Sequence, residues 1–207
     1  MNQELHGWIN DPRKVEAVMN KLPFPVFGDV WESIKGSGKG KVILLYEIIR
    51  KVAGENNYPY REQEIGDCVS HGAAYAVDAV KAVDIYLKND FEEWIAETAT
   101  EDIYAGSRVQ IGDGSMGGGD GSVGAWAADY VSKFGALPRQ KYGDIDLTNY
   151  SGSRARKWGG PRSGVPKELL EISKQHPIQI VSRVDNYEQV DRKSTRLNSS
   201  HIPLSSY

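Results

Sequence analysis

The segment 68–87 constrains the fold of this chain more than any other part of the sequence. Its apolar residues recur at intervals of three and four, which predicts one continuous amphipathic helix. Alanine fills several of its positions, so this helix is narrow and other elements can pack closely against it. A chain of 207 residues can bury a core large enough to surround such a helix. We therefore expect a domain built around a central helix that begins at Cys68.

Similar patterns predict the remaining elements. Helices are expected at 11–21, 42–52, 123–134 and 166–174, and the alternation in IQIVSRV predicts a strand at 178–184. Extended or irregular structure is expected at 22–27, 36–41, 112–124 and 151–166, and a further helix from Tyr187 onward. Since segment 112–124 holds seven glycines, it must form a loop. This mixture of helices with a late strand indicates the α+β class.

Composition excludes several classes of function. A single cysteine excludes an internal disulfide and any cysteine-cluster zinc or iron–sulfur site, and we expect no metal and no cofactor. With 25 basic against 28 acidic residues, nothing marks a nucleic-acid-binding protein. The mean hydropathy of −0.49 and the short apolar runs argue against a membrane span. The GSGKGK stretch lacks the spacing of a phosphate-binding loop. No signal peptide is evident, so we expect a cytoplasmic or phage-associated protein.

The last 17 residues differ in character from the rest of the chain. Residues 191–201, DRKSTRLNSSH, match the in-frame translation of an adapter oligonucleotide used in DNA sequencing libraries. We therefore expect residues 191–207 to be a non-native tail and the parent protein to continue differently after Val190. The alternative is an ordinary serine-rich chain terminus.

Cys68 is the residue with the clearest chemical potential. The first turn of a helix carries unpaired N–H groups and a partial positive charge, which favour a thiolate over a thiol. Because the thiolate is the nucleophilic form, a cysteine at this position is a candidate nucleophile. The alternative is a buried structural cysteine. Asp67 is expected to cap the helix, and His71, three residues after Cys68 on the same helix, is expected to be structural.

Three blocks of sequence carry a resemblance to a known family: QEIGDCVSHGAA, GDGSVGAWAADYVSKFGALP and HPIQIVSRVDNYEQV. Together they resemble the papain-like cysteine peptidase superfamily, in an uncharacterised bacterial and phage branch, over residues 58–190. The resemblance implies a helical lobe at 58–177 that carries the nucleophile and the beginning of a β-rich second lobe at 178–190. Residues 1–57 would form an N-terminal extension with helices.

The resemblance also implies roles for individual residues. Cys68 would be the catalytic nucleophile, and Gln63 would join the Cys68 N–H in binding the oxyanion, although the family spaces this glutamine one residue further from the cysteine. The substrate-binding residues would be Gly66 and Asp67 beside the nucleophile and Gly121 and Ser122 on the glycine-rich loop. The substrate would be a peptide or a protein.

The base histidine of the family comes from the second lobe, beyond the residues that match, and we do not assign it to His201. We therefore expect this chain to be inactive. Trp126 is expected to belong to the core.

Two other functions fit the same sequence. A non-catalytic papain-like protein, a structural or binding component of a phage particle, would keep the fold without the chemistry. A thiol amidase or acyltransferase would use the same nucleophile on another acyl group. The sequence does not predict an oligomeric state.

Overall fold

The computed structural model describes residues 12–21, 44–54, 62–88, 94–176, 178, 180–184 and 201–205. The expectations for 22–27 and 36–41 and for a helix after Tyr187 lie outside these residues. The elements, in chain order, are α1 (Pro12–Met19), α3 (Leu45–Ala53), α4 (Cys68–Lys88), α5 (Glu101–Gly106), the π-helix η2 (Ser107–Ile111), α6 (Gly124–Phe134), β1 (Lys141–Tyr142), β2 (Ile145–Asp146), α7 (Gly152–Trp158), α8 (Lys167–Ser173), β3 (Ile180–Val184) and β4 (His201–Ser205). The α+β class is confirmed.

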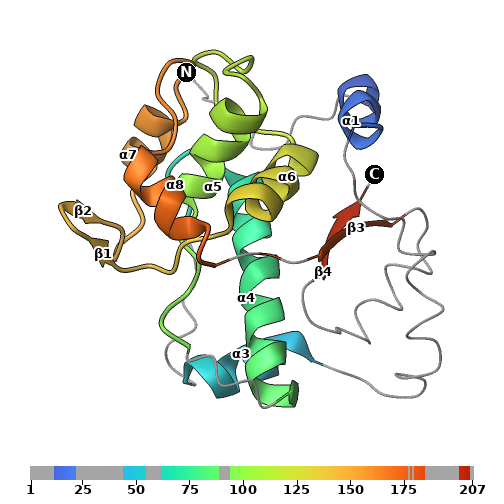
Figure 1. Cartoon of the computed structure of the whole chain (residues 1–207), viewed down its shortest axis with the longest axis vertical. Helices are drawn as coiled ribbons and strands as arrows, with labels where there is room; N and C mark the ends of the chain where they lie inside the picture. Colours follow the sequence, from blue (N-terminus) through green and yellow to red (C-terminus); the bar gives the residue numbers. More distant parts are fainter. Residues whose placement is uncertain are drawn as a thin grey trace.

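Helix α4 runs through the middle of the molecule, as its sequence pattern predicts (Figure 1). Its small side chains allow close packing, and Ala74, Val77 and Ala82 are fully buried. Helix α3 crosses the lower end of α4 in Figure 1, while α5 and α6 lie at the upper end, where α4 begins. Cys68 therefore starts the central helix at the end of the molecule where most helices gather.

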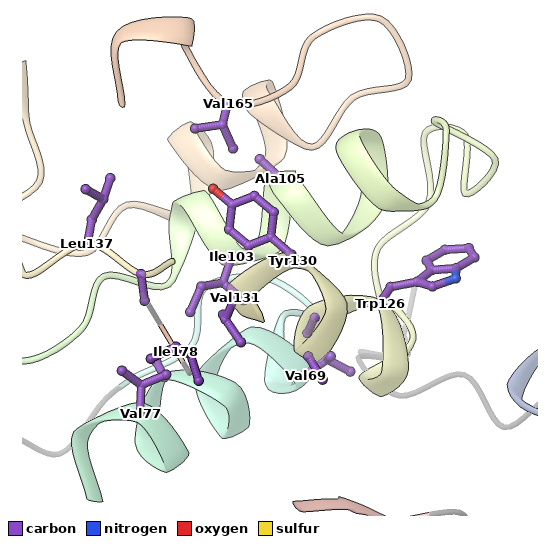
Figure 2. Close-up of a cluster of buried hydrophobic side chains, with 14 of the residues drawn as sticks. Val69, Val77, Ile103, Ala105, Trp126, Tyr130, Val131, Leu137, Val165 and Ile178 are labelled. Atoms are coloured by element: carbon purple, nitrogen blue, oxygen red, sulfur yellow. The ribbon is translucent and has the colours of Figure 1, made fainter. Parts of the chain in front are cut away.

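The main hydrophobic core joins α4, α5 and α6 (Figure 2). Val77 from α4, Ile103 from α5, and Tyr130 and Val131 from α6 are each at most 1% exposed. Trp126 is part of this cluster, so its predicted place in the core is confirmed. A smaller cluster fixes α3 to the C-terminal half of α4, and it consists of Ile48, Ile49, Ala79, Ala82 and Val83.

The helices predicted at 11–21, 42–52, 123–134 and 166–174 are confirmed in type, as α1, α3, α6 and α8. Gly135 ends α6 with a φ of 81°, a conformation that glycine adopts without strain.

The prediction of irregular structure at 151–166 is wrong in part, because α7 occupies Gly152–Trp158. The Ser151 hydroxyl accepts a hydrogen bond from the Arg154 N–H at 3.2 Å and so caps this helix. Helix α5, the π-helix η2 and the two-residue strands β1 and β2 had no clear sequence signal. In α5 and η2 this is because charged residues are buried where an apolar pattern would be expected.

Strand β3 confirms the strand predicted at 178–184. It pairs in parallel with β4, with Ile180 opposite His201 and Val184 opposite Ser205. Since β4 lies in the segment that we expect to be non-native, that expectation stays a prediction. Strands β1 and β2 form a separate antiparallel pair. Among the described residues, no helix has both the length and the apolar character that crossing a membrane requires.

Candidate functional site

The Cys68 side chain is exposed at the first residue of α4. Partial burial raises the pKa of the Cys68 thiol above its ordinary value, and the negative charge of Asp67 raises it further. Hydrogen bonds from the backbone N–H groups of Val69 and Cys68 lower the pKa, as expected at a helix start, but they do not outweigh the other two causes. The helix start therefore favours the thiolate as predicted, but within the described surroundings it does not bring the pKa of Cys68 below its ordinary value.

The Asp67 side chain is fully buried beside Cys68 and has three partners. Its carboxylate accepts hydrogen bonds from Gln63 Nε2 at 3.3 Å and from the Tyr150 hydroxyl at 2.8 Å. His71 Nε2 lies 3.3 Å from the same carboxylate, one helical turn further along α4. The backbone carbonyl of Asp67 accepts the N–H groups of Ser70 and His71, as at a helix start. Asp67 is thus a fixed negative charge next to the thiol, and His71 is a buried partner of that charge.

Tyr150 connects this turn to the segment before α7. Its hydroxyl oxygen accepts the Glu64 N–H at 3.3 Å while its proton is donated to Asp67. Its ring packs edge-on against His71, with ring centroids 5.2 Å apart. Burial raises the pKa of Tyr150, and Asp67 raises it further, so Tyr150 stays a donor. Sequence reasoning missed Tyr150, which lies in a polar stretch without a motif.

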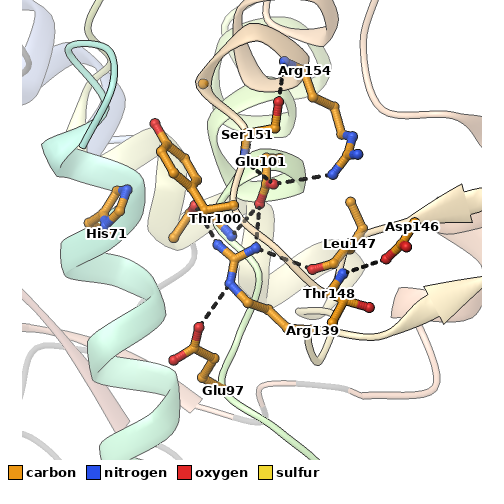
Figure 3. Close-up of polar contacts among 12 residues, drawn as sticks. His71, Glu97, Thr100, Glu101, Arg139, Asp146, Leu147, Thr148, Ser151 and Arg154 are labelled. Atoms are coloured by element: carbon orange, nitrogen blue, oxygen red, sulfur yellow. Dashed lines mark hydrogen bonds and ion pairs between the residues drawn. The ribbon is translucent and has the colours of Figure 1, made fainter. Parts of the chain in front are cut away.

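A buried ion-pair cluster holds the Tyr150 segment in place (Figure 3). Glu101, fully buried in α5, accepts the Ser151 N–H at 3.0 Å and pairs with Arg139 at 3.1 Å. Arg139 also pairs with Glu97 at 3.1 Å and lies over the Tyr150 ring at 5.8 Å. Every charge in this cluster has a partner of opposite sign, which is the arrangement that makes buried charges tolerable.

The glycine-rich loop is fixed to the turn before Cys68. The Gly66 N–H donates to a carboxylate oxygen of Asp120 at 3.4 Å, and Arg156 binds the same carboxylate at 2.9 Å. Burial alone would raise the pKa of Asp120, but the hydrogen bonds from Arg156 and Gly66 lower it below its usual value. The structure therefore brings Gly66 and the loop together, although they are far apart in sequence.

Gly121 and Ser122 lie on the buried side of this loop. The Ser122 hydroxyl is 2.7 Å from that of Ser107, and the Gly121 carbonyl accepts a hydrogen bond from Arg108. Their predicted contact with substrate stays a prediction. Within residues 117–121 of the loop the exposed residues are Gly118 and Gly119, and a side chain at Gly118 would meet no other atom within 4 Å.

No protein-family model, curated protein or solved structure matches the chain. The geometry of Cys68, its turn and the loop is therefore the basis of the functional proposal.

Proposed function

We propose that this chain carries the nucleophile half of a papain-like cysteine hydrolase, most simply a peptidase. The observation that carries the proposal is the docking of the glycine-rich loop on the turn before Cys68, through the Gly66–Asp120 hydrogen bond. Cys68 follows Gly66 by two residues and is exposed, and the exposed Gly118 and Gly119 directly precede Asp120. Exposed backbone can bind an extended peptide by strand-like hydrogen bonds, which would bring a peptide carbonyl to the sulfur.

The two exposed glycines beside Asp120 support this reading. Neither Gly118 nor Gly119 has a positive φ, and neither would place a side chain within 3.4 Å of another atom. The chain's own packing thus does not require glycine at either position. Glycine there does leave room for a second backbone to approach closely.

In the proposed reaction, the Cys68 thiolate attacks the carbonyl carbon of a peptide bond and forms a tetrahedral intermediate. The backbone N–H of Cys68 and the amide of Gln63 donate to the oxyanion. One Gln63 N–H already binds Asp67, and the amide nitrogen has a second. The amine leaves with the proton taken from the thiol, and water then hydrolyses the thioester.

The raised pKa of Cys68 means that the reaction needs a base that faces the sulfur. His71 does not fit this role, because its Nε2 lies within the buried part of the turn, 3.3 Å from the Asp67 carboxylate. In our proposal the base is a histidine of the parent protein beyond Val190. An imidazolium near the sulfur would also favour the thiolate and so offset the effect of Asp67.

A non-catalytic binding protein with the same fold is the second candidate. The specific observation in its favour is the pKa of Cys68, which is raised by burial and by Asp67. In this case the loop would bind a partner segment while the cysteine stays a thiol. An amidase or acyltransferase would share the chemistry of the first candidate and differ in its acyl substrate.

Mass spectrometry after incubation with a peptidyl electrophile, such as a peptidyl epoxide, tests the proposal, with Cys68→Ser as control. We expect one adduct per chain, located on Cys68, and no turnover of fluorogenic peptides by the same sample. Absence of the adduct in folded protein would exclude the hydrolase and leave the binding protein. Turnover that Cys68→Ser abolishes would place the base within this chain and contradict our assignment of it to the parent protein.

A further inference from the structure

Arg108, in the π-helix η2, makes an unusual set of contacts with the glycine-rich loop. Its guanidinium donates to the carbonyl oxygens of Gly117 at 3.0 Å, of Gly119 at 2.6 Å and of Gly121. Its Nε donates to the carbonyl of Gly159 at 2.9 Å, at the end of α7. One buried side chain, 2% exposed, therefore binds every second carbonyl of segment 117–121.

None of these four hydrogen bonds goes to a carboxylate, and all of their acceptors are backbone carbonyls, although the charge of Arg108 also acts on the nearby Asp120 carboxylate. Its guanidinium also lies 4.9 Å from the centroid of the Tyr104 ring, which is a favourable position for a cation. Burying a cation is costly unless its donors are satisfied. The planar guanidinium can satisfy several carbonyls at once, whereas the ammonium of lysine is a compact charge with different geometry.

The loop needs such an anchor because of its composition. Glycine loses more conformational entropy on ordering than any other residue, and a run of glycines has no side chains with which to fix itself. The Gly66–Asp120 hydrogen bond and the Arg156–Asp120 ion pair hold the loop at one residue only. Arg108 holds it at three further positions, on both sides of Asp120.

We infer that Arg108 is a positioning residue that holds segment 117–121 in the shape that binds an extended peptide beside Cys68. This inference rests on the proposed function. Arg108 touches neither the thiol nor, by this inference, the substrate. It acts through the loop carbonyls, and its loss impairs peptide binding while the chemistry of the thiol is preserved.

Two reagents separate these effects. Iodoacetamide is small and reports the reactivity of the Cys68 thiol alone. A peptidyl epoxide first binds reversibly through its peptide part, so its alkylation rate saturates and yields an inhibition constant that measures peptide binding. In Arg108→Lys and Arg108→Gln we expect that constant to rise at least about tenfold, since displacing a binding group by about 1 Å can cost about 10²-fold. The iodoacetamide rate is expected to stay within about twofold of wild type.

Arg139→Lys is the matched control, because Arg139 is also a buried arginine but binds Glu97 and Glu101 rather than the loop, and lysine keeps the charge that pairs with them and so keeps the Tyr150 segment in place. It is expected to lower the melting temperature without raising the inhibition constant. An unchanged constant in folded Arg108→Lys would overturn the inference, as would equal effects of the Arg108 and Arg139 variants. A wild-type chain that does not saturate with the epoxide would instead refute the proposed function.

A measurement on the wild-type chain covers the case in which neither Arg108 variant folds. The Nη protons of buried Arg108 are expected to shift in NMR spectra when Cys68 carries the peptidyl adduct, and to stay unchanged when it carries only a carboxamidomethyl group. Equal spectra for the two adducts would contradict the inference.

Discussion

Asp67 and Asp102 are both fully buried carboxylates near the start of a helix, yet their surroundings differ completely. Asp67, before α4, has Gln63, Tyr150 and His71 as partners. Asp102, in the first turn of α5, has no side-chain hydrogen-bond partner for either oxygen among the described residues. Burial, followed by the nearby charge of Glu101, raises the pKa of Asp102 to about 8, although the backbone N–H groups of Ile103 and Asp102 and the charge of Arg139 act in the opposite direction. The two carboxylates thus share burial and helix position and differ in the side-chain partners that the fold supplies.

The largest effect is expected from Asp102→Asn. Between about pH 4 and pH 8 the carboxyl is protonated in the folded state and ionised in the unfolded state, so unfolding releases a proton. The free energy of unfolding therefore falls by up to about 1.4 kcal/mol per pH unit as the pH rises through this range. The asparagine variant lacks this contribution and becomes more stable than wild type at pH 8.

Urea denaturation of wild type and Asp102→Asn at pH 5 and pH 8 measures the difference in their free energies of unfolding. Asp146→Asn, which removes an exposed carboxylate, is the control. Identical pH dependence for wild type and Asp102→Asn would show that the Asp102 carboxyl is ionised in the folded chain.

Replacement of a partner in the neighbouring ion-pair cluster tests the opposite case, in which buried charges are paired. Arg139→Leu leaves Glu97 and Glu101 without this partner, and we expect a loss of about 3 kcal/mol in the free energy of unfolding. Urea denaturation at pH 7 gives the value. A loss below about 0.5 kcal/mol would mean that the cluster contributes little and that Tyr150 is positioned by other contacts.

Asp67→Asn tests the other carboxylate of the comparison, through its effect on the Cys68 thiol. Removal of the negative charge is expected to lower the pKa of Cys68, so carboxamidomethylation by iodoacetamide at pH 8 becomes several-fold faster. The asparagine oxygen can still accept the Tyr150 proton, which keeps the turn in place. Asp129→Asn, on α6, serves as control for a change of one charge. A slower reaction in folded Asp67→Asn would show that Asp67 activates the thiol.

The smallest effect is expected from removal of residues 191–207. If this tail is non-native, its loss changes neither the pH dependence that Asp102 causes nor the reactivity of Cys68, and the melting temperature stays within a few degrees. Differential scanning fluorimetry and the iodoacetamide rate are the measurements. A cooperative loss of folding would mean that the β3–β4 pairing is an integral part of the structure.

The elements that depend on local pattern could be predicted from the sequence. The periodicity at 68–87 predicts α4, and the glycines at 112–124 predict the loop. The partners of Asp67 could not be predicted, because Tyr150 lies 83 residues away and no pattern marks it. The same holds for Arg108, whose partners are backbone carbonyls with no sequence signature.

The sequence predicts only one of the influences on the pKa of Cys68, for a related reason. The helix start is a local feature and does act in the expected direction, through the N–H groups of Cys68 and Val69. Burial and the fixed charge of Asp67 depend on the tertiary structure and outweigh it. Asp67 is adjacent to Cys68 in sequence, but its effect on the thiol depends on the buried position in which distant residues such as Tyr150 hold it.

The rate of Cys68 carboxamidomethylation as a function of pH tests the central claim most directly. Our account predicts that the thiol of the folded chain reacts and that the rate rises with a single inflection above the ordinary cysteine value of 9.0. An inflection near neutral pH would contradict the role assigned to burial and Asp67. A thiol that reacts only after unfolding would contradict the proposal that Cys68 is a nucleophile within reach of a substrate.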